Sequence, residues 1–373
     1  MTKLLTVIGA RPQIIKAAAV SRAICEQFSD SVQDIILHTG QHYDDNLSAQ
    51  FFDELNIPQP TYNLGVGSGS HGLQTAHMIA GIEEILTKEP FDGVLVYGDT
   101  NSTLAGALAA AKQQIPVFHI EAGLRSFNMT MPEEQNRIVA DQLSNICFAP
   151  TQTALDNLRH EGFIDSPTLF LNNRRRKVLV SGDIMYDNSV YFAKIAAERC
   201  TIMQQLQLQH GQYVLATVHR NYNTDDISRL TAIFNALATI AEQQHIAVII
   251  PLHPRTKTIL EANAWSSPHI TIIPPVSYLE MIELERHAQV VMTDSGGVQK
   301  EAFFYERPCV ILRPETEWVE IVEHGAGLLA DADTDRIVEA YARLAHSEVH
   351  FPPLFGKGHA AEYIINEIIN YLK

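Results

Sequence analysis

The chain alternates short, largely apolar runs with longer amphipathic stretches. In the first half the runs are KLLTVIG, DIILHTG, GVLVYG, PVFHI and ICFAP, and the stretches 101–113 and 132–144 have helical periodicity. Runs that are apolar along their whole length are typical of strands buried on both faces of a parallel sheet. The pattern therefore predicts a doubly wound α/β domain in which helices connect parallel strands.

A second set of the same kind follows a helical stretch around residues 190–209. Its runs are YVLATVH, AVIIPL, ITIIP, VVMTD and PCVIL, and residues 360–372 have the pattern of one more helix. A chain of 373 residues is too long for one ordinary core, since domains average roughly 150 residues. We predict two Rossmann-like domains, residues 1–187 and 188–355, with a cleft between them and a terminal helix at 356–373.

The composition is that of a folded globular protein, with 46% hydrophobic and 19% charged residues. No apolar run approaches the roughly 20 residues of a membrane helix, and the amino terminus begins in a predicted strand, so we expect neither a signal peptide nor an anchor. The four cysteines lack CxxC or zinc-type spacing, which fits a reducing cytoplasm. A formal charge of −16 argues against nucleic acids and anionic membranes as partners.

The first candidate site is the opening segment VIGARPQIIK. It places Gly9, Arg11 and Lys16 at a strand-to-helix junction, where free backbone amides and fixed cations suit a phosphate or another anion. The segment does not match GxGxxG, so a nicotinamide cofactor is not expected. An ordinary tight turn with two surface cations explains the same residues, and the segment alone does not separate the two interpretations.

Two acids follow separate predicted strands of the first domain. Asp99 lies in GDTNSTLAGALAAAK and Glu121 in HIEAGLR. The carboxyl ends of parallel strands share one edge of a sheet, so we expect these carboxylates to converge there, where clustered acids can raise one another's pKa for proton transfer. Asp99 could instead be a simple helix cap.

A third acidic segment opens the predicted helix at 132–144. Glu133 and Glu134 follow Pro132, and Arg137 lies one turn later. Acids at the start of a helix are often only partners of the helix dipole. Beside Asp99 and Glu121, however, they would supply both an acid and a base.

In the second domain, His219 and His253 each follow a predicted strand, although a histidine in such a place is often a packing residue. The DSGGVQKEAF segment is more informative. Ser295, Gly296 and Gly297 open a helix there and can form an amide nest for a diphosphate, and Glu301, one turn later, could bind a ribose diol. A glycine turn capped by Asp294 or Ser295 is the alternative interpretation.

A metal site is not expected. His38 and His42 have i,i+4 spacing, but they lie across a strand end and a turn. No HExxH motif or acid-rich loop accompanies them.

Taken in order, GARPQIIK, HTGQH, YGDTNSTLAGALAA, HIEAGLRS, MPEEQNR, SGD and TDSGGVQKEA resemble the non-hydrolysing UDP-N-acetylglucosamine 2-epimerase family along nearly the whole chain. The resemblance implies a GT-B fold, with two doubly wound sheets facing a cleft and a last helix crossing back to the first domain. It also implies a reaction without NAD or another cofactor. A base removes the carbon 2 proton, UDP leaves carbon 1, and the bound glycal takes UDP back after reprotonation on its other face.

The resemblance also implies roles for individual residues, leaving open which acid is the carbon 2 base. The residues matching the family's catalytic site are Asp99, Glu121, Glu133, His219, Lys16 and Arg137. The residues matching its UDP site are Arg11, Ser295, Gly296, Gly297 and Glu301, to which we add Tyr278 for the uracil region and His253.

Several local forms depart from the family pattern. The usual HRxEN motif reads HRNYN, with Tyr222 in place of an acid, and the forms FNMTMPEE and TEWVE replace the commoner YSPWPEE and TERPE. The last two resemble the branch acting on UDP-2,3-diacetamido-2,3-dideoxy-glucuronate, which gives a manno-configured uronate for surface polysaccharides such as O-antigen or capsule. A uronate needs a cation for its carboxylate, and Arg125 and Arg313 lie near these motifs.

The expected partner is therefore a UDP-linked amino sugar, and the resemblance implies a cytoplasmic homodimer. Epimerisation of UDP-N-acetylglucosamine to UDP-N-acetylmannosamine is the alternative reaction. A GT-B glycosyltransferase, a hydrolysing 2-epimerase and a catalytically dead sugar-nucleotide sensor remain competing hypotheses. The acids Asp99 and Glu121 argue against the transferase, which needs no carbon 2 base.

Overall fold

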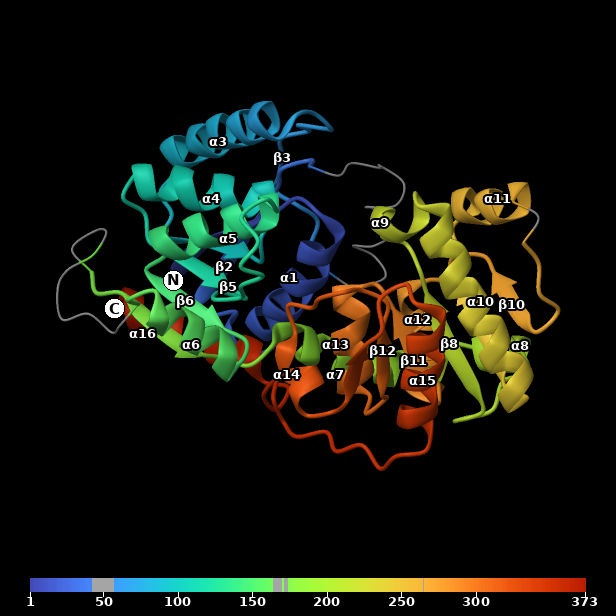
Figure 1. Ribbon diagram of the computed structural model, residues 1–373. Helices are drawn as coiled ribbons and strands as arrows, with labels where there is room; N and C mark the ends of the chain where they lie inside the picture. The colour runs from blue at the N-terminus through green and yellow to red at the C-terminus, as the bar shows by residue number, and fades with distance from the viewer. Residues whose placement is uncertain (42–56, 164–169, 171–173, 264) are drawn as a thin grey trace. The chain divides into compact units, whose positions relative to one another are not determined.

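The computed structural model of the protein describes residues 1–41, 57–163, 170, 174–263 and 265–373 (Figure 1). The chain divides into two compact units. The first consists of Met1–Asn188 and Pro353–Lys373, and the second of Ser189–Pro352. Both units are α/β structures built on a parallel sheet, as the alternation of apolar and amphipathic segments predicts.

The first unit contains a seven-stranded sheet in the order β3-β2-β1-β4-β5-β6-β7. Its strands are β1 (Thr2–Ile8), β2 (Val32–His38), β3 (Tyr62–Asn63), β4 (Gly93–Tyr97), β5 (Val117–Ile120), β6 (Ile146–Ala149) and β7 (Lys177–Val180). Its helical segments are α1 (Arg11–Ala23), the π-helical turn η1 (Ile24–Phe28), α3 (His71–Lys88), α4 (Asn101–Lys112), α5 (Pro132–Leu143), α6 (Gln152–His160), the start of α7 (Ile184–Arg199), and α16 (Ala360–Leu372).

Helices α3, α4 and α5 cover one face of this sheet (Figure 1). Alternate residues of β1, Leu5 and Val7, pack into the core with Met78 and Ile82 of α3. The small residues of α4 bring that helix close to the strands. A Cβ atom at Gly106 would lie 2.9 Å from Val96 Cγ1. This close packing brings the start of α4 to the carboxyl end of the sheet.

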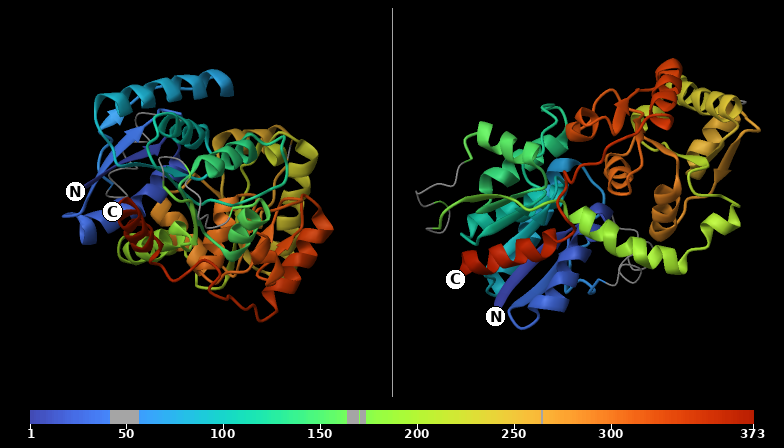
Figure 2. Two further views of the ribbon diagram at one scale, coloured as in Figure 1. Left: turned by 90° about the vertical axis from the view of Figure 1, so that its left-hand side faces the viewer. Right: turned by 90° about the horizontal axis from the view of Figure 1, so that it is seen from below.

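The terminal helix α16 packs beside α1 in the first unit (Figure 2). Ile364, Ile365 and Ile368 are fully buried along one side of it. The Tyr371 ring contacts the Phe118 ring edge-on at 5.9 Å between centroids. At the start of α16, the Asp187 carboxylate accepts a hydrogen bond of 2.8 Å from the Ala361 N–H. The last segment of the chain is thus part of the amino-terminal core.

The second unit contains a six-stranded sheet in the order β10-β9-β8-β11-β12-β13. Its strands are β8 (Tyr213–Thr217), β9 (Ala247–Pro251), β10 (Ile270–Ile273), β11 (Val290–Thr293), β12 (Cys309–Ile311) and β13 (Gly327–Leu329). Its helices, besides the rest of α7, are α8 (Ile202–Gln205), α9 (Asn221–Thr224), α10 (Ile227–Gln244), α11 (Pro254–Ala262), α12 (Tyr278–His287), α13 (Gly296–Phe304), α14 (Val319–Glu323) and α15 (Thr334–Ala345).

The period-two pattern of β8 separates two cores in this unit. Val214 and Ala216 join the cluster formed with α10 and α15, whereas Tyr213 and Leu215 join the cluster formed with α8, α12 and α13. Both faces of the strand are therefore buried. This is the arrangement that a fully apolar run predicts for a doubly wound sheet.

Two sequence expectations need correction. The edge strands β3, β7 and β13 are not predicted, because they are only two to four residues long and pair with a neighbour on one side. The helical stretch around 190–209 is interrupted. Helix α7 ends at Arg199, Thr201 leaves the helical conformation (φ −117°, ψ 11°), and α8 is a separate short helix.

Candidate functional site

The strand orders place one crossover reversal in each unit. In the first unit the order reverses between β1 and β4, and in the second between β8 and β11. Ligands of open α/β sheets bind outside the carboxyl ends of the strands at such a reversal. The segments that follow these four strands contain Arg11, Asp99, His219 and Ser295.

A buried glutamine shapes the turn between β1 and α1. Gln13 Oε1 accepts hydrogen bonds from the N–H groups of Gly9 (2.9 Å) and Ala10 (3.2 Å), and its amide donates to the Tyr97 carbonyl (2.9 Å). A Cβ at Gly9 would overlap the hydroxyl oxygens of Thr39 and Ser102. The turn is therefore held against the end of β4, with Arg11 exposed as the first residue of α1.

Lys16 and Glu121 form an ion pair at the carboxyl edge of this sheet. Their side chains are only 12% and 8% exposed, so the pair is largely withdrawn from water. Glu121 adopts a left-handed backbone conformation (φ 68°), which a non-glycine residue rarely adopts and which often marks a functional position. A Cβ at Gly98 would lie 3.0 Å from Glu121 Oε2 and 3.1 Å from Lys16 Nζ, so the pair sits against the residue that precedes Asp99.

Arg137 joins two further acids at the same edge. Its guanidinium forms one ion pair with Asp99 and another, of 2.6 Å, with Glu134. Burial would raise the pKa of Glu134, but hydrogen bonds from the Ser126 and Phe127 N–H groups, together with the charge of Arg137, hold that pKa below its ordinary value. Glu134 is thus an ionised anchor, while the Asp99 side chain remains 33% exposed.

A buried charge network lies beneath these acids. His119 Nε2 contacts the Gly98 carbonyl oxygen at 2.7 Å, and its Nδ1 contacts Asp141 at 2.7 Å. Burial would raise the pKa of Asp141, but His119 and Arg125 hold it below its ordinary value. The His119 ring thus bridges the Gly98 backbone and the Asp141 carboxylate. The network fixes the strand ends that carry Asp99 and Glu121.

In the second unit, fully buried Asp294 organises the segment that contains His219. Its carboxylate accepts hydrogen bonds from the N–H groups of His219 (3.1 Å) and Arg220 (3.0 Å) and from the Asn223 amide (3.1 Å). The His219 ring lies 3.3 Å from Asp294 Oδ1 at Nδ1, and the side chain is 55% exposed. The ring is oriented by the carboxylate and open to a ligand.

The next residues form the start of α13. Ser295 caps the helix and accepts from the Val298 N–H at 3.4 Å, and Gly296 and Gly297 form its first turn. A Cβ at Gly296 would overlap a Glu317 carboxylate oxygen, so a side chain there would require the Glu317 side chain to move. Free amides at the start of a helix are suited to a phosphate group.

A model of the UDP-N-acetylglucosamine 2-epimerase family matches residues 26–369. The chain belongs to this family. It is 50% identical over 364 residues to the UDP-2,3-diacetamido-2,3-dideoxy-D-glucuronate 2-epimerase of Pseudomonas aeruginosa, with 97% of this chain and 98% of that protein covered. A UDP-N-acetylglucosamine 2-epimerase homolog of Methanococcus maripaludis is 45% identical over 374 residues, covering 99% of each chain.

A solved structure supports the same family and fold. The UDP-GlcNAc 2-epimerase of Methanocaldococcus jannaschii, in complex with UDP-GlcNAc and UDP, has a TM-score of 0.85 and 39% identity, covering 99% of this chain and 100% of that one. The predicted membership of the 2-epimerase family and the predicted pair of GT-B-like, parallel-sheet α/β domains are confirmed.

Two other candidate residues, Glu133 and His253, are exposed. Glu133 is exposed on the first turn of α5, and the acids that Arg137 contacts are Asp99 and Glu134. His253 is exposed and caps α11, where its Nδ1 accepts from the Arg255 N–H at 3.2 Å.

The two remaining candidates of the second unit are buried. Tyr278 packs edge-on against Phe192 with 5.6 Å between ring centroids. Glu301 is 8% exposed in α13.

Arg125 is not available to bind a substrate carboxylate. Its side chain is 1% exposed and forms ion pairs with Asp141 (2.8 Å) and Glu161 (2.6 Å). Arg313, the other cation near the departures from the family pattern, lines a cavity of the second unit.

Sequence reasoning missed Gln13, His119, Asp141 and Asp294 as organising residues. Asp294 carries the clearest signal, since a buried strand places it directly before the glycine turn. In the part of the chain that the structure describes, no group of three or more His, Cys, Asp or Glu side chains is arranged to hold a metal ion. His42 lies outside the described residues, and none of the described helices is long and apolar enough to cross a membrane.

Proposed function

We propose that this protein is a non-hydrolysing 2-epimerase that converts UDP-2,3-diacetamido-2,3-dideoxy-glucuronate to its manno epimer. The observation that carries the proposal is the 50% identity, over 97% of this chain, to the Pseudomonas aeruginosa 2-epimerase of that substrate. The acidic cluster of the first unit supports an epimerase, because an epimerase needs a carbon 2 base and a glycosyltransferase does not.

In the proposed reaction a carboxylate takes the carbon 2 proton, and the electrons of that bond form a carbon 1–carbon 2 double bond. The bond from carbon 1 to oxygen breaks, and UDP leaves with the electron pair. Proton return to the opposite face and re-addition of UDP complete the inversion. No carbonyl acidifies the carbon 2 proton, so stabilisation of the leaving diphosphate must lower much of the barrier.

We assign the proton transfers to the acids Asp99, Glu121 and Glu133, without choosing the base among them. Glu121 has the strongest support, because it is withdrawn from water and paired with Lys16. We assign Lys16, Arg137 and His219 to the charges that develop during elimination.

We assign UDP binding to residues that lie mostly near the start of α13. The N-terminal amides of that helix support the assignment, since they suit a diphosphate. The residues are Arg11, Ser295, Gly296, Gly297, Glu301, Tyr278 and His253.

The alternative substrate is UDP-N-acetylglucosamine, which the similar Methanocaldococcus jannaschii enzyme binds in its solved structure. Proton NMR in deuterated water, with each sugar supplied in parallel, tests the proposal. Deuterium at carbon 2 and a manno product from the diacetamido uronate are expected. Exchange only with UDP-N-acetylglucosamine would move the substrate to the alternative, release of free sugar would indicate a hydrolysing enzyme, and no exchange with either would favour a transferase or a sensor.

Three accompanying proposals concern the cellular setting. We propose that the enzyme is a cytoplasmic homodimer and that its product enters the synthesis of a surface polysaccharide such as O-antigen or capsule. The 2-epimerase resemblance supports all three. Light scattering tests the dimer, cell fractionation tests the location, and the polysaccharide composition of a strain without the enzyme tests the pathway.

A further inference from the structure

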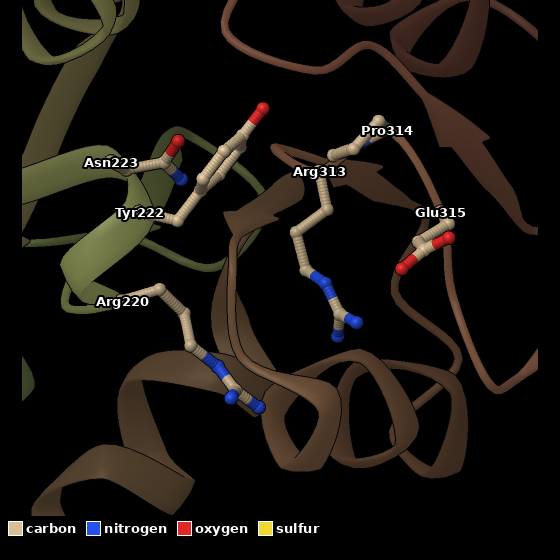
Figure 3. Close-up of a pocket in the computed structure, with 6 residues that line it drawn as sticks. All are labelled: Arg220, Tyr222, Asn223, Arg313, Pro314 and Glu315. Carbon is tan, nitrogen blue, oxygen red and sulfur yellow. The ribbon is translucent and has the colours of Figure 1, made fainter. Parts of the chain in front are cut away.

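The second unit contains a cavity of about 370 Å³ at the carboxyl end of its sheet. The segment after β8 forms one wall and the segment after β12 forms the other (Figure 3). The lining residues are Arg220, Tyr222, Asn223, Arg313, Pro314 and Glu315.

Asn223 ties both walls to the start of α13. Its side-chain amide donates to Asp294 Oδ2 at 3.1 Å and to the Leu312 carbonyl at 3.0 Å. Asp294 directly precedes the Ser295–Gly297 turn, and Leu312 directly precedes Arg313. The cavity is therefore held in a defined position beside the proposed diphosphate site, without help from a ligand.

Two guanidinium groups enter the cavity. Arg220 and Arg313 extend from opposite walls, and their charged ends turn toward the same space in Figure 3. Arg313 Nη1 is buried and lies 3.0 Å from Glu317 Oε2, yet within the described part of the chain it forms no hydrogen bond. This contact is an ion pair without hydrogen-bond alignment, so the N–H groups of Arg313 Nη1 are not satisfied within the described part of the chain.

Because position 222 is a tyrosine, the side of the cavity formed by the segment after β8 has no acidic lining residue. The family pattern has an acid at this position, whereas here the Arg229 guanidinium lies 3.9 Å from the centre of the Tyr222 ring. Arg229 is itself held by Asp331 and by Asn223 Oδ1 at 3.1 Å. The six lining residues include two guanidinium groups and one carboxylate, that of Glu315, and outside the lining the Glu317 carboxylate pairs with Arg313.

We propose that Arg220 and Arg313 bind the carbon 6 carboxylate of the substrate, and that Tyr222, in place of the acid of the usual HRxEN motif, lets these two arginines favour a uronate. The inference rests on the proposed function and assigns residues to its substrate preference. Planar guanidinium groups match a carboxylate with paired hydrogen bonds, whereas the hydroxymethyl group of an ordinary hexose offers no charge to them. The α13 amides hold the diphosphate, and the cavity beside them receives the second anionic group of the same molecule.

The test compares two UDP-sugars that differ only at carbon 6, the diacetamido uronate and the corresponding diacetamido glucose. We expect Arg220→Met and Arg313→Met each to lower the ratio of kcat/KM values, uronate over glucose form, by at least about twentyfold, as loss of a charge-assisted pair implies. Arg313→Lys is expected to recover part of the ratio. Arg343→Met, the same change on the exposed side of α15, should leave the ratio unchanged.

A second pair of variants tests the charge of the cavity without removing an arginine. Tyr222 is 59% exposed, so substitutions there should not prevent folding. Glutamine has nearly the same shape as glutamate but no charge. We therefore expect Tyr222→Glu to have a several-fold lower ratio of kcat/KM values, uronate over glucose form, than Tyr222→Gln. Equal ratios in these two variants would contradict the inference.

The other outcomes separate this inference from the proposed function. If the arginine variants lose the same factor on both sugars and UDP affinity falls in parallel, the guanidinium groups bind the diphosphate and the inference fails while the epimerase proposal stands. An unchanged ratio at full activity also overturns it. If wild-type enzyme inverts neither diacetamido sugar, the proposed substrate fails, and the carboxylate assignment fails with it.

Discussion

Lys16 and Glu121 form an ion pair across 105 residues of sequence. One side chain comes from the second turn of α1, and the other follows β5, two positions away from β1 in the sheet. The parallel sheet brings them together because both segments begin at the same edge. The adjacent ammonium group keeps this carboxylate in its ionised form, which is the form that can accept a proton.

Glu121→Gln and Asp99→Asn test the proposed proton transfers. Each substitution keeps the shape of the side chain and removes its ability to exchange a proton, so we expect turnover to fall by at least about a hundredfold with the fold intact. Isotope exchange at carbon 2 and circular dichroism provide the measurements. The exposed acid Glu84, paired with Lys88 on α3, supplies the control Glu84→Gln. Near-normal turnover in both site variants would overturn the assignment.

Asp141→Asn tests the charge network below the site. The substitution leaves Arg125 and His119 without their shared buried carboxylate, which should cost about 3–5 kcal/mol of folding free energy. For a unit of this size we expect the melting temperature to fall by roughly 6–20 °C. Asp156→Asn removes an exposed acid paired with Arg159 and should have little effect. Equal melting temperatures for the two variants would show that the network contributes no net stability.

Asp187 should make the stability of the first unit depend on pH. Burial is the main cause that raises the pKa of this carboxyl to about 6. The folded chain thus holds the proton more tightly than the unfolded chain, where the pKa is near 4. The contribution to stability is complete below about pH 4 and is lost as the pH rises through about 6.

Asp187→Asn removes this titration. We expect the variant to be more stable than wild type at pH 8, by up to about 2–3 kcal/mol, with the difference shrinking toward pH 5. Melting curves recorded between pH 5 and pH 8 provide the measurement, and Asp156→Asn again serves as the control. A constant difference across this range would rule out Asp187 as the titrating group.

Gly9→Ala tests the close approach of the β1–α1 turn to its neighbours. The added methyl group would overlap Thr39 and Ser102, so we expect lower stability and a large loss of turnover as Lys16 moves with α1. Gly72→Ala is the matched control, since its Cβ would meet nothing within 4 Å at the start of α3. We expect that change to be neutral or slightly stabilising. Thermal melting and the carbon 2 exchange assay distinguish the two variants.

The sheets were predictable where strands are buried on both sides. The apolar runs at β1, β4, β8 and β11 predict the central strands. The edge strand β13 was not predicted, because the pattern of three residues is too short to be distinguished from that of a loop. The end of helix α7 at Arg199 was not predicted for a different reason. The amphipathic pattern continues through Thr201, so apolar spacing alone gives no sign that the backbone leaves the helix there.

For the site, the sequence predicts which residues end neighbouring strands but not which of them pair. The sequence predicts that Asp99 and Glu121 lie at one edge of the sheet. It does not predict that Glu134, rather than Glu133, is the buried partner of Arg137, because that depends on the direction in which α5 leaves its turn. Arg125 illustrates the same limit. A cation beside a substrate motif looks available for binding until its ion pairs with Asp141 and Glu161 are known.

The position of α16 determines the order in which the protein can be completed during translation. The second unit is one continuous segment and can fold once Pro352 has left the ribosome, but the first unit still lacks α16 at that moment. At 5–20 residues per second, its partly covered sheet waits roughly ten to thirty seconds while the second unit is synthesised. The amino-terminal half is therefore completed last. In a chain that stops before Ile364, the apolar surface that α16 normally covers stays exposed and is a binding surface for chaperones.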